Sequence, residues 1–319
     1  MDVFLVLGKI ISIFFIIFLG ALGYRKKWFP VESEKYFMNL MMNITGPCLI
    51  FYSMQGQNRT SVVNAKALQV FILMAIAILL TCIISIILVK LLNAPLEDRG
   101  VYRMAMVFTN CGFMGYPLAL AVFGEDGLFL AIIANMAFLL LIFSIGPFLL
   151  IYDQKSSGSK TLNFRTFVSI PLASSIIGLL IFILNIKLPL LVADTFKIVG
   201  EMTIPLAMLI IGIQLAQSNA RRVFTNVKLI AIIIIRLVLI PIILFLIFFK
   251  APMDPLVFCV VIFAMSLPAA AFIGVLASRY GCNSILAAEC IFTTTLFSLI
   301  SIPVVATVLN YYLLLKHYY

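Results

Sequence analysis

The chain has 319 residues, of which 64% are hydrophobic and 11% are charged, and its mean hydropathy is +1.21. A soluble domain carries roughly 25% charged residues, so this composition excludes a water-soluble globular protein and predicts an all-α polytopic membrane protein embedded in the lipid bilayer. The net charge of +10 would suggest nucleic acid in a soluble protein. In a membrane protein the positive-inside bias of the loops explains it, and no nucleic-acid partner is expected.

The apolar runs predict about ten transmembrane helices, because a spanning helix needs about 20 apolar residues. The first run, 3–24, is followed rather than preceded by Arg25-Lys26-Lys27, which predicts a retained helix and not a signal peptide. In chain order the other expected helices are 37–53, 67–90, 101–121, 127–152, 166–186, 190–216, 229–249, 255–278 and 284–312.

Lysine and arginine are distributed unequally between the two sets of loops. The loops after the first, third, fifth, seventh and ninth helices carry 14 of them, counting the adjoining helix ends, whereas the other loops and both termini carry 7. The positive-inside rule places the richer set in the cytoplasm. We therefore expect a multi-pass protein of the plasma membrane with both termini outside the cytoplasm.

The two halves of the chain contain similar short motifs. We expect a first five-helix repeat at 1–152, a cytoplasmic linker at 153–165 and a second repeat at 166–319. Five is an odd number, so the second repeat must enter the membrane from the opposite side. Such a 5+5 inverted repeat is typical of secondary transporters. The motifs are Thr45-Gly-Pro47 and Thr203-Ile-Pro205, Ser144-Ile-Gly-Pro147 and Ser301-Ile-Pro303, and the single prolines Pro117 and Pro268.

The segment 109–117, TNCGFMGYP, predicts a break in the fourth helix near the middle of the membrane. Proline removes a backbone donor and costs about 3 kcal/mol or more inside a helix. In hydrocarbon such a break survives only where it lines protein or an aqueous cavity. The matching segment of the second half, SLPAAAFIG at 266–274, predicts a second broken crossover helix.

Two broken helices at equivalent positions indicate a substrate site at the midplane, although a pair of ordinary proline kinks used for packing is the alternative. The N-termini of half-helices carry partial positive charge and free N–H groups, which suit a carboxylate. Asn135 is also a candidate for this site, because the fifth helix follows the first break and would face the same cavity. The expected substrate-binding residues are Asn110, Cys111, Gly112, Gly115, Pro117, Asn135, Pro268 and Ala269.

The run NCGFMGYPL, followed by AVFGEDG, closely resembles the crossover helix of the auxin efflux carrier family, and MSLPAAAFIGVLASRYG resembles the ninth helix of that family. The resemblance implies ten helices divided between a scaffold and a mobile transport domain, a homodimer, and elevator-type movement of organic anions. Bacterial relatives are associated with malate, malonate and lactate. By this resemblance Asn110 is the best candidate for contact with substrate, and Pro117 and Pro268 hold the crossing helices.

One stretch departs from the family pattern. Plant carriers have an Asp-Thr-Leu-Gln-Lys-like run near the start of the third helix, and the comparable stretch here, residues 65–70, reads AKALQV. The acid and the lysine of that run are both replaced. A plant-type hormone substrate and any coupling role of those two groups are therefore in doubt.

Two charged residues, Arg236 and Glu289, lie inside expected spans at similar depths. An unpaired charge at the bilayer centre costs at least about 2.5–3.5 kcal/mol, which favours a mutual ion pair or a role in coupling. In the alternative, Arg236 extends to the cytoplasmic interface and Glu289 is solvated or lies near Arg279.

The remaining chemistry-bearing residues give no sign of an enzyme or of a metal site. The only histidine is His317, the six cysteines show no CxxC spacing, and there are no paired carboxylates, so no metal and no cofactor are expected. The leading hypothesis is a secondary transporter of small carboxylates. The rival is a sodium-coupled bile-acid-like symporter or another ion-coupled carrier of similar fold, and coupling to H⁺ or Na⁺ stays open.

Overall fold

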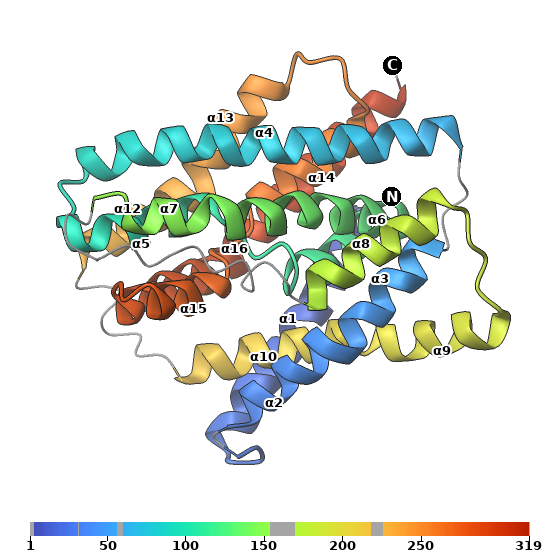
Figure 1. Ribbon diagram of the computed structural model, residues 1–319, viewed down its shortest axis with the longest axis horizontal. Helices are drawn as coiled ribbons and strands as arrows, with labels where there is room; N and C mark the ends of the chain where they lie inside the picture. Colours follow the sequence, from blue (N-terminus) through green and yellow to red (C-terminus); the bar gives the residue numbers. More distant parts are fainter. Residues whose placement is uncertain (1–2, 31, 56–59, 154–169, 218–225, 319) are drawn as a thin grey trace.

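The computed structural model describes residues 3–30, 32–55, 60–153, 170–217 and 226–318, and this part of the chain is helical throughout apart from loops and one isolated bridge (Figure 1). The all-α prediction is confirmed. The expected linker at 153–165 lies outside the described residues except for its first residue, Asp153.

The first half of the chain contains long continuous helices, such as α1 and α4, and helices that are interrupted. Its second expected span is a helix pair joined by a π-helical turn, and its fourth is broken between α5 and α6. The elements are α1 Val3–Arg25, α2 Ser33–Leu40, η1 Met41–Thr45, α3 Gly46–Gln55, α4 Ser61–Leu91, α5 Leu96–Val107, α6 Gly115–Ser144 and α7 Gly146–Ile151. Gly124, with φ of 73°, kinks α6 where the sequence predicts the loop between two spans.

The second half repeats this mixture of continuous and interrupted helices. Its elements are α8 Ile170–Ile183, α9 Leu190–Glu201, α10 Thr203–Gln217, α12 Val227–Ile234, η3 Ile235–Leu239, α13 Ile240–Phe248, α14 Pro255–Met265, α15 Phe272–Arg279 and α16 Ser284–Tyr318. Five helical segments of the described chain are long and apolar enough to cross a membrane: 61–91, 115–144, 190–217, 227–248 and 284–316. These segments support a polytopic membrane protein, while ten spans and an inverted repeat stay predictions.

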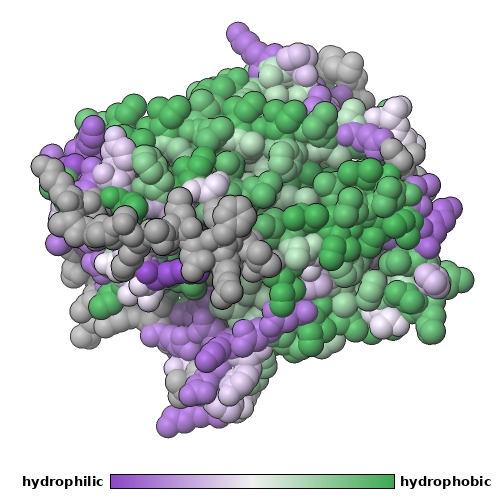
Figure 2. Space-filling view, in the orientation of Figure 1, coloured by the Kyte–Doolittle hydropathy of each residue, from purple (hydrophilic) through white to green (hydrophobic). Residues whose placement is uncertain are grey.

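Helix α4 shows why the surface of this protein suits lipid. Its exposed side is lined by large aliphatic side chains, whereas its buried side includes alanine, serine, threonine and cysteine. In a bilayer the small and weakly polar residues face neighbouring helices, and the large apolar ones face lipid. Figure 2 shows the same feature on one whole face, where hydrophobic surface covers the middle and hydrophilic patches gather toward the edges and on the lower projection. The exposed residues of α4 are Val62, Leu68, Ile72, Ile76, Leu79, Ile83, Ile87 and Leu91.

The helices form two groups. The first comprises α1 to α3 and α8 to α10, and the second comprises α4 to α7 and α12 to α16 (Figure 1). In the first group α1 and α10 pack backbone to backbone: a Cβ on Gly212 would lie 2.0 Å from the carbonyl oxygen of Ile17, and one on Gly20 would lie 2.5 Å from that of Leu209. Only glycine allows so close an approach of the two backbones.

Candidate functional site: the crossover of two interrupted helices

The first interruption separates α5 from α6. Helix α5 ends at Val107, Phe108 is extended with φ of −97° and ψ of 124°, and α6 begins at Gly115. Pro117 therefore lies in the first turn of α6, where the missing N–H would have had no intrahelical acceptor. The proline begins a new helix here and does not bend a continuous one.

The second interruption separates α14 from α15. Helix α14 ends at Met265, and α15 begins at Phe272. Pro268 and Ala269 lie in the short non-helical stretch between them. As at the first break, the chain passes from one helix to the next through a few extended residues.

The two interruptions meet and pair as a minimal antiparallel bridge between Thr109 and Ala269. The Asn110 N–H donates to the carbonyl of Pro268 at 2.8 Å, and the Ala270 N–H donates to the carbonyl of Phe108 at 3.0 Å. Each interruption thus supplies hydrogen-bond partners for backbone groups of the other that have no partner within a helix. This mutual pairing explains how two broken helices are tolerated where water is scarce.

A cavity of about 60 Å³ adjoins the crossing, and we call it the crossover cavity. Four of the expected site residues line it: Asn110, Cys111, Gly112 and Asn135. The other four, Gly115, Pro117, Pro268 and Ala269, form the crossing itself without lining the cavity. Helices of the first group close the opposite side through Met41, Met42, Gly46, Pro47, Ile50, Pro171 and Thr203.

Several polar groups at the cavity lack partners in the described part of the chain. Asn135, which is 4% exposed, donates from Nδ2 to the Tyr116 hydroxyl at 2.7 Å, but its Oδ1 accepts no hydrogen bond. The Thr203 hydroxyl is likewise buried without a partner. Among the described residues Asn110 forms hydrogen bonds through its backbone groups alone, so its side-chain amide is available to a ligand. Buried polar groups without partners are rare in proteins, so these groups identify a place where a polar ligand can bind.

Glycine at position 112 keeps the cavity open. A Cβ on Gly112 would lie 3.9 Å from both amide atoms of Asn135, so it would fill the space in front of that side chain without a clash. The Cys111 thiol is 2% exposed and contacts the Thr109 hydroxyl. Cys111 therefore faces the cavity in a conformation that shields it from bulk solvent.

Arg236 lies behind the crossing in the π-helical turn η3 and is 0% exposed. Its Nε donates to the carbonyl of Leu267 at 3.0 Å, and its Nη1 donates to the carbonyl of Met106 at 2.8 Å. Within the described residues Nη2 has no partner and Arg236 forms no ion pair. The expected pairing with Glu289 is therefore absent in this conformation, because the guanidinium faces the ends of α5 and α14. Its burial also excludes the alternative of an interfacial position.

A second cavity of about 540 Å³ lies next to the first, and we call it the side cavity. Both cavities are lined by Met42, Phe113 and Phe272, and the two phenylalanine rings lie 6.3 Å apart between their centroids. The side cavity continues to Glu34 and Gln217, near the start of α2 and the end of α10, which the sequence predicts to face the cytoplasm.

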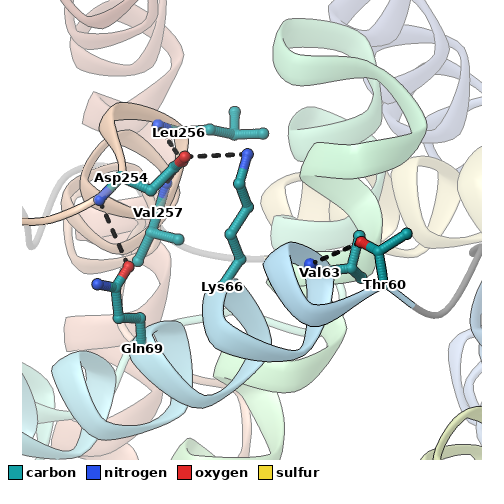
Figure 3. Close-up of polar contacts among 7 residues, drawn as sticks. All are labelled: Thr60, Val63, Lys66, Gln69, Asp254, Leu256 and Val257. Atoms are coloured by element: carbon teal, nitrogen blue, oxygen red, sulfur yellow. Dashed lines mark hydrogen bonds and ion pairs between the residues drawn. The ribbon is translucent and has the colours of Figure 1, made fainter.

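The stretch that departs from the family pattern forms a separate polar cluster at the start of α14 (Figure 3). Lys66 of α4 pairs with Asp254 at 2.9 Å. The other carboxylate oxygen of Asp254 accepts from the N–H groups of Leu256 and Val257 at 2.9 and 3.2 Å and thereby caps the helix. The Asp254 N–H donates to Gln69 at 3.4 Å. Lys66 of α4 is thus paired with an acid at the start of another helix, α14.

Sequence reasoning missed several residues of the crossover cavity. Tyr116 holds Asn135, Thr203 presents an unpaired hydroxyl, and Phe113 and Phe272 separate the two cavities. Tyr116 and Phe113 lie inside the motif 109–117, and Thr203 begins one of the repeated Thr-x-Pro motifs, so both signals were present in the sequence.

Comparison with known proteins agrees with this architecture. A family model described as membrane transport protein matches residues 5–306. An uncharacterized transporter of Methanocaldococcus jannaschii is 26% identical over 299 residues, covering 90% of this chain and 94% of that protein. One of Methanothermobacter thermautotrophicus is 26% identical over 310 residues, covering 95% and 99%. One of Escherichia coli is 22% identical over 219 residues, covering 66% and 68%. The chain therefore belongs to the membrane transport protein family, the auxin efflux carrier family that its crossover segments resemble.

Proposed function

We propose that this protein is a secondary transporter of small organic anions with carboxylate groups, such as malate or lactate, and that the crossover cavity is its binding site. The observation that carries the proposal is the meeting of two interrupted helices beside unpaired amide groups. Helices α6 and α15 both begin at the cavity, where Gly112, Phe113 and Phe272 line its wall. Helix N-termini carry about half a positive charge each and attract anions.

Free donors beside the cavity support a carboxylate over a cation as cargo. The N–H groups of Gly112 and Phe113 have no acceptor among the described residues, and the Asn110 amide supplies further N–H donors. A carboxylate oxygen accepts such donors, which strengthen when water is excluded. Asn135 Oδ1 and the Thr203 hydroxyl add acceptors for a substrate hydroxyl, a group that malate and lactate both carry.

The size of the cavity supports alternating access. One buried water needs about 10–15 Å³ of such volume, so about 60 Å³ holds only a few waters and leaves little room for a dicarboxylate. Binding would require Phe113, Phe272 and Met42 to part, joining the cavity to the much larger side cavity. We propose that the second helix group carries the crossing past the first in an elevator-type motion within a homodimer of the plasma membrane.

The test is uptake of labelled malate, lactate and malonate, with an auxin-like acid for comparison, into proteoliposomes containing the purified protein. We expect saturable uptake and counterflow for at least one of the three small carboxylates. Imposed gradients of H⁺ or Na⁺ would identify the coupling ion and so distinguish a sodium-coupled symporter. Absence of saturation and counterflow for all of these acids under every gradient would refute the proposal.

Asn110→Ala tests the site itself. Removing the amide should abolish or strongly reduce uptake while the protein folds normally, because the side chain makes no hydrogen bond to any residue that the structure describes. Asn43→Ala, in the same class of uncharged amide but outside the lining of the crossover cavity, is the matched control. Equal uptake by wild type and Asn110→Ala would move the binding site elsewhere.

A further inference from the structure

The guanidinium of Arg236 is buried between the two broken helices, and no carboxylate of the described residues forms an ion pair with it. Arg236 bonds to one carbonyl from each break, Met106 at the end of α5 and Leu267 just after α14. In the described residues no carboxylate pairs with it. Burying an unpaired charge is strongly unfavourable, so other interactions must offset the cost of removing this guanidinium from water.

The charges of the helix ends supply that compensation. Each helix C-terminus carries about −0.5 of an elementary charge, so the ends of α5 and α14 together carry about −1. The guanidinium carries +1 and bonds to one carbonyl near each end, that of Met106 in the last turn of α5 and that of Leu267 two residues after the end of α14. Without it, two negative helix ends would lie next to the cavity and would offset the positive N-termini of α6 and α15.

Arginine fits this position better than lysine would. The two carbonyls belong to different chain segments, and the planar guanidinium reaches both with two separate N–H groups. A lysine ammonium is a compact point charge on a flexible stem and lacks this fork. The π-helical turn that holds Arg236 precedes Pro241, whose ring displaces the preceding turn and so favours the widened helix.

We propose that Arg236 determines the preference of the crossover cavity for an anion over a neutral molecule of the same shape. This inference rests on the proposed transport of carboxylates. Arg236 acts through the helix ends and is not among the residues that line the cavity, so it is a positioning residue without direct contact to substrate in this conformation. Its charge is close enough to act there, since it bonds to Leu267, whose neighbour Pro268 accepts a hydrogen bond from the cavity-lining Asn110.

The experiment compares matched pairs of ligands. Purified wild type and Arg236→Gln are tested for binding of lactate against lactamide and of malonate against malonamide, by competition with the labelled carboxylate and by shifts in melting temperature. A unit charge about 10 Å away at an effective dielectric constant of about 20 changes affinity by roughly ten- to twentyfold. We expect Arg236→Gln to lower the preference for the carboxylate by about that factor and to leave the affinity for the amide nearly unchanged.

Two further variants keep the inference falsifiable. Arg103→Gln removes another buried guanidinium. Arg103 bonds to the carbonyl of Leu149 and pairs with Asp153, and not with a residue of either interruption, so the variant should leave the preference intact. Arg236→Lys keeps the charge and should retain most of the preference, which gives a result even if Arg236→Gln does not fold.

The outcomes separate the two proposals. If wild type binds none of these carboxylates, the proposed function fails. If wild type prefers the carboxylates and folded Arg236→Gln keeps the same preference, only the role of Arg236 is refuted. Equal loss of carboxylate and amide binding, or loss of the preference in Arg236→Lys, would likewise overturn it, because both results indicate damage to the shape of the cavity.

Discussion

The polar cluster at the start of α14 allows the two roles of one carboxylate to be separated. Asp254 caps the helix with one oxygen and pairs with Lys66 through the other (Figure 3). Replacing a capping aspartate by alanine costs about 1 kcal/mol. The ion pair contributes only about 0.5 kcal/mol, because Lys66 and Asp254 are 31% and 24% exposed and water screens their attraction.

These magnitudes predict an order of stabilities. Asp254→Ala loses both interactions and should lower the free energy of unfolding by about 1.5 kcal/mol. Asp254→Asn keeps a good capping oxygen and should lose only about 0.5 kcal/mol, the same as Lys66→Met. At roughly 2 °C per kcal/mol the melting temperatures should fall by about 3 °C for the alanine and about 1 °C for the other two.

The assay is thermal unfolding of the purified protein in detergent at low and high NaCl. Salt screens the ion pair but leaves the neutral cap unaffected, so the difference between wild type and Asp254→Asn should shrink at high salt. The difference between Asp254→Asn and Asp254→Ala should persist. If Asp254→Asn destabilises the protein as much as Asp254→Ala, the cap contributes nothing and this reasoning is wrong.

Three other predictions concern packing and the cavity. Gly212→Ala should sharply reduce the yield of folded protein on size-exclusion chromatography, because its Cβ would lie 2.0 Å from the Ile17 carbonyl oxygen. The control Gly8→Ala, whose Cβ meets nothing within 4 Å, should leave the yield unchanged. Equal yields of the two variants would contradict the close packing of α1 and α10. Gly112→Ala should fold normally, with an unchanged melting temperature, but should weaken carboxylate binding in competition assays; unchanged affinity would mean that substrate avoids this space. Cys111 should react slowly with a small polar thiol reagent, monitored by mass spectrometry, and excess substrate should protect it; an inert thiol during turnover would count against the cavity as the transport path.

The sequence alone was enough to predict the class of fold and the location of the breaks. Too few charged residues for a water-exposed surface and long apolar runs predict helices in lipid, because each backbone polar group in hydrocarbon must bond within its own segment. The motif at 109–117 and Pro268 predict interruptions because glycine, asparagine and proline all disfavour a helix interior. Both interruptions are found where they were predicted, and Asn110 and Asn135 both line one cavity.

Only the tertiary structure decided which groups meet. Arg236 and Glu289 lie at similar depths in the sequence-predicted spans, which suggested an ion pair. Depth does not determine the direction in which a side chain points around the helix axis, and the guanidinium bonds to the backbone carbonyls of Met106 and Leu267. The partner of Lys66 is likewise distant in sequence, since Asp254 lies 188 positions further along the chain. Helical periodicity fixes which residues share a face, but the partners across that face depend on how distant segments pack, and this information is absent from any local pattern.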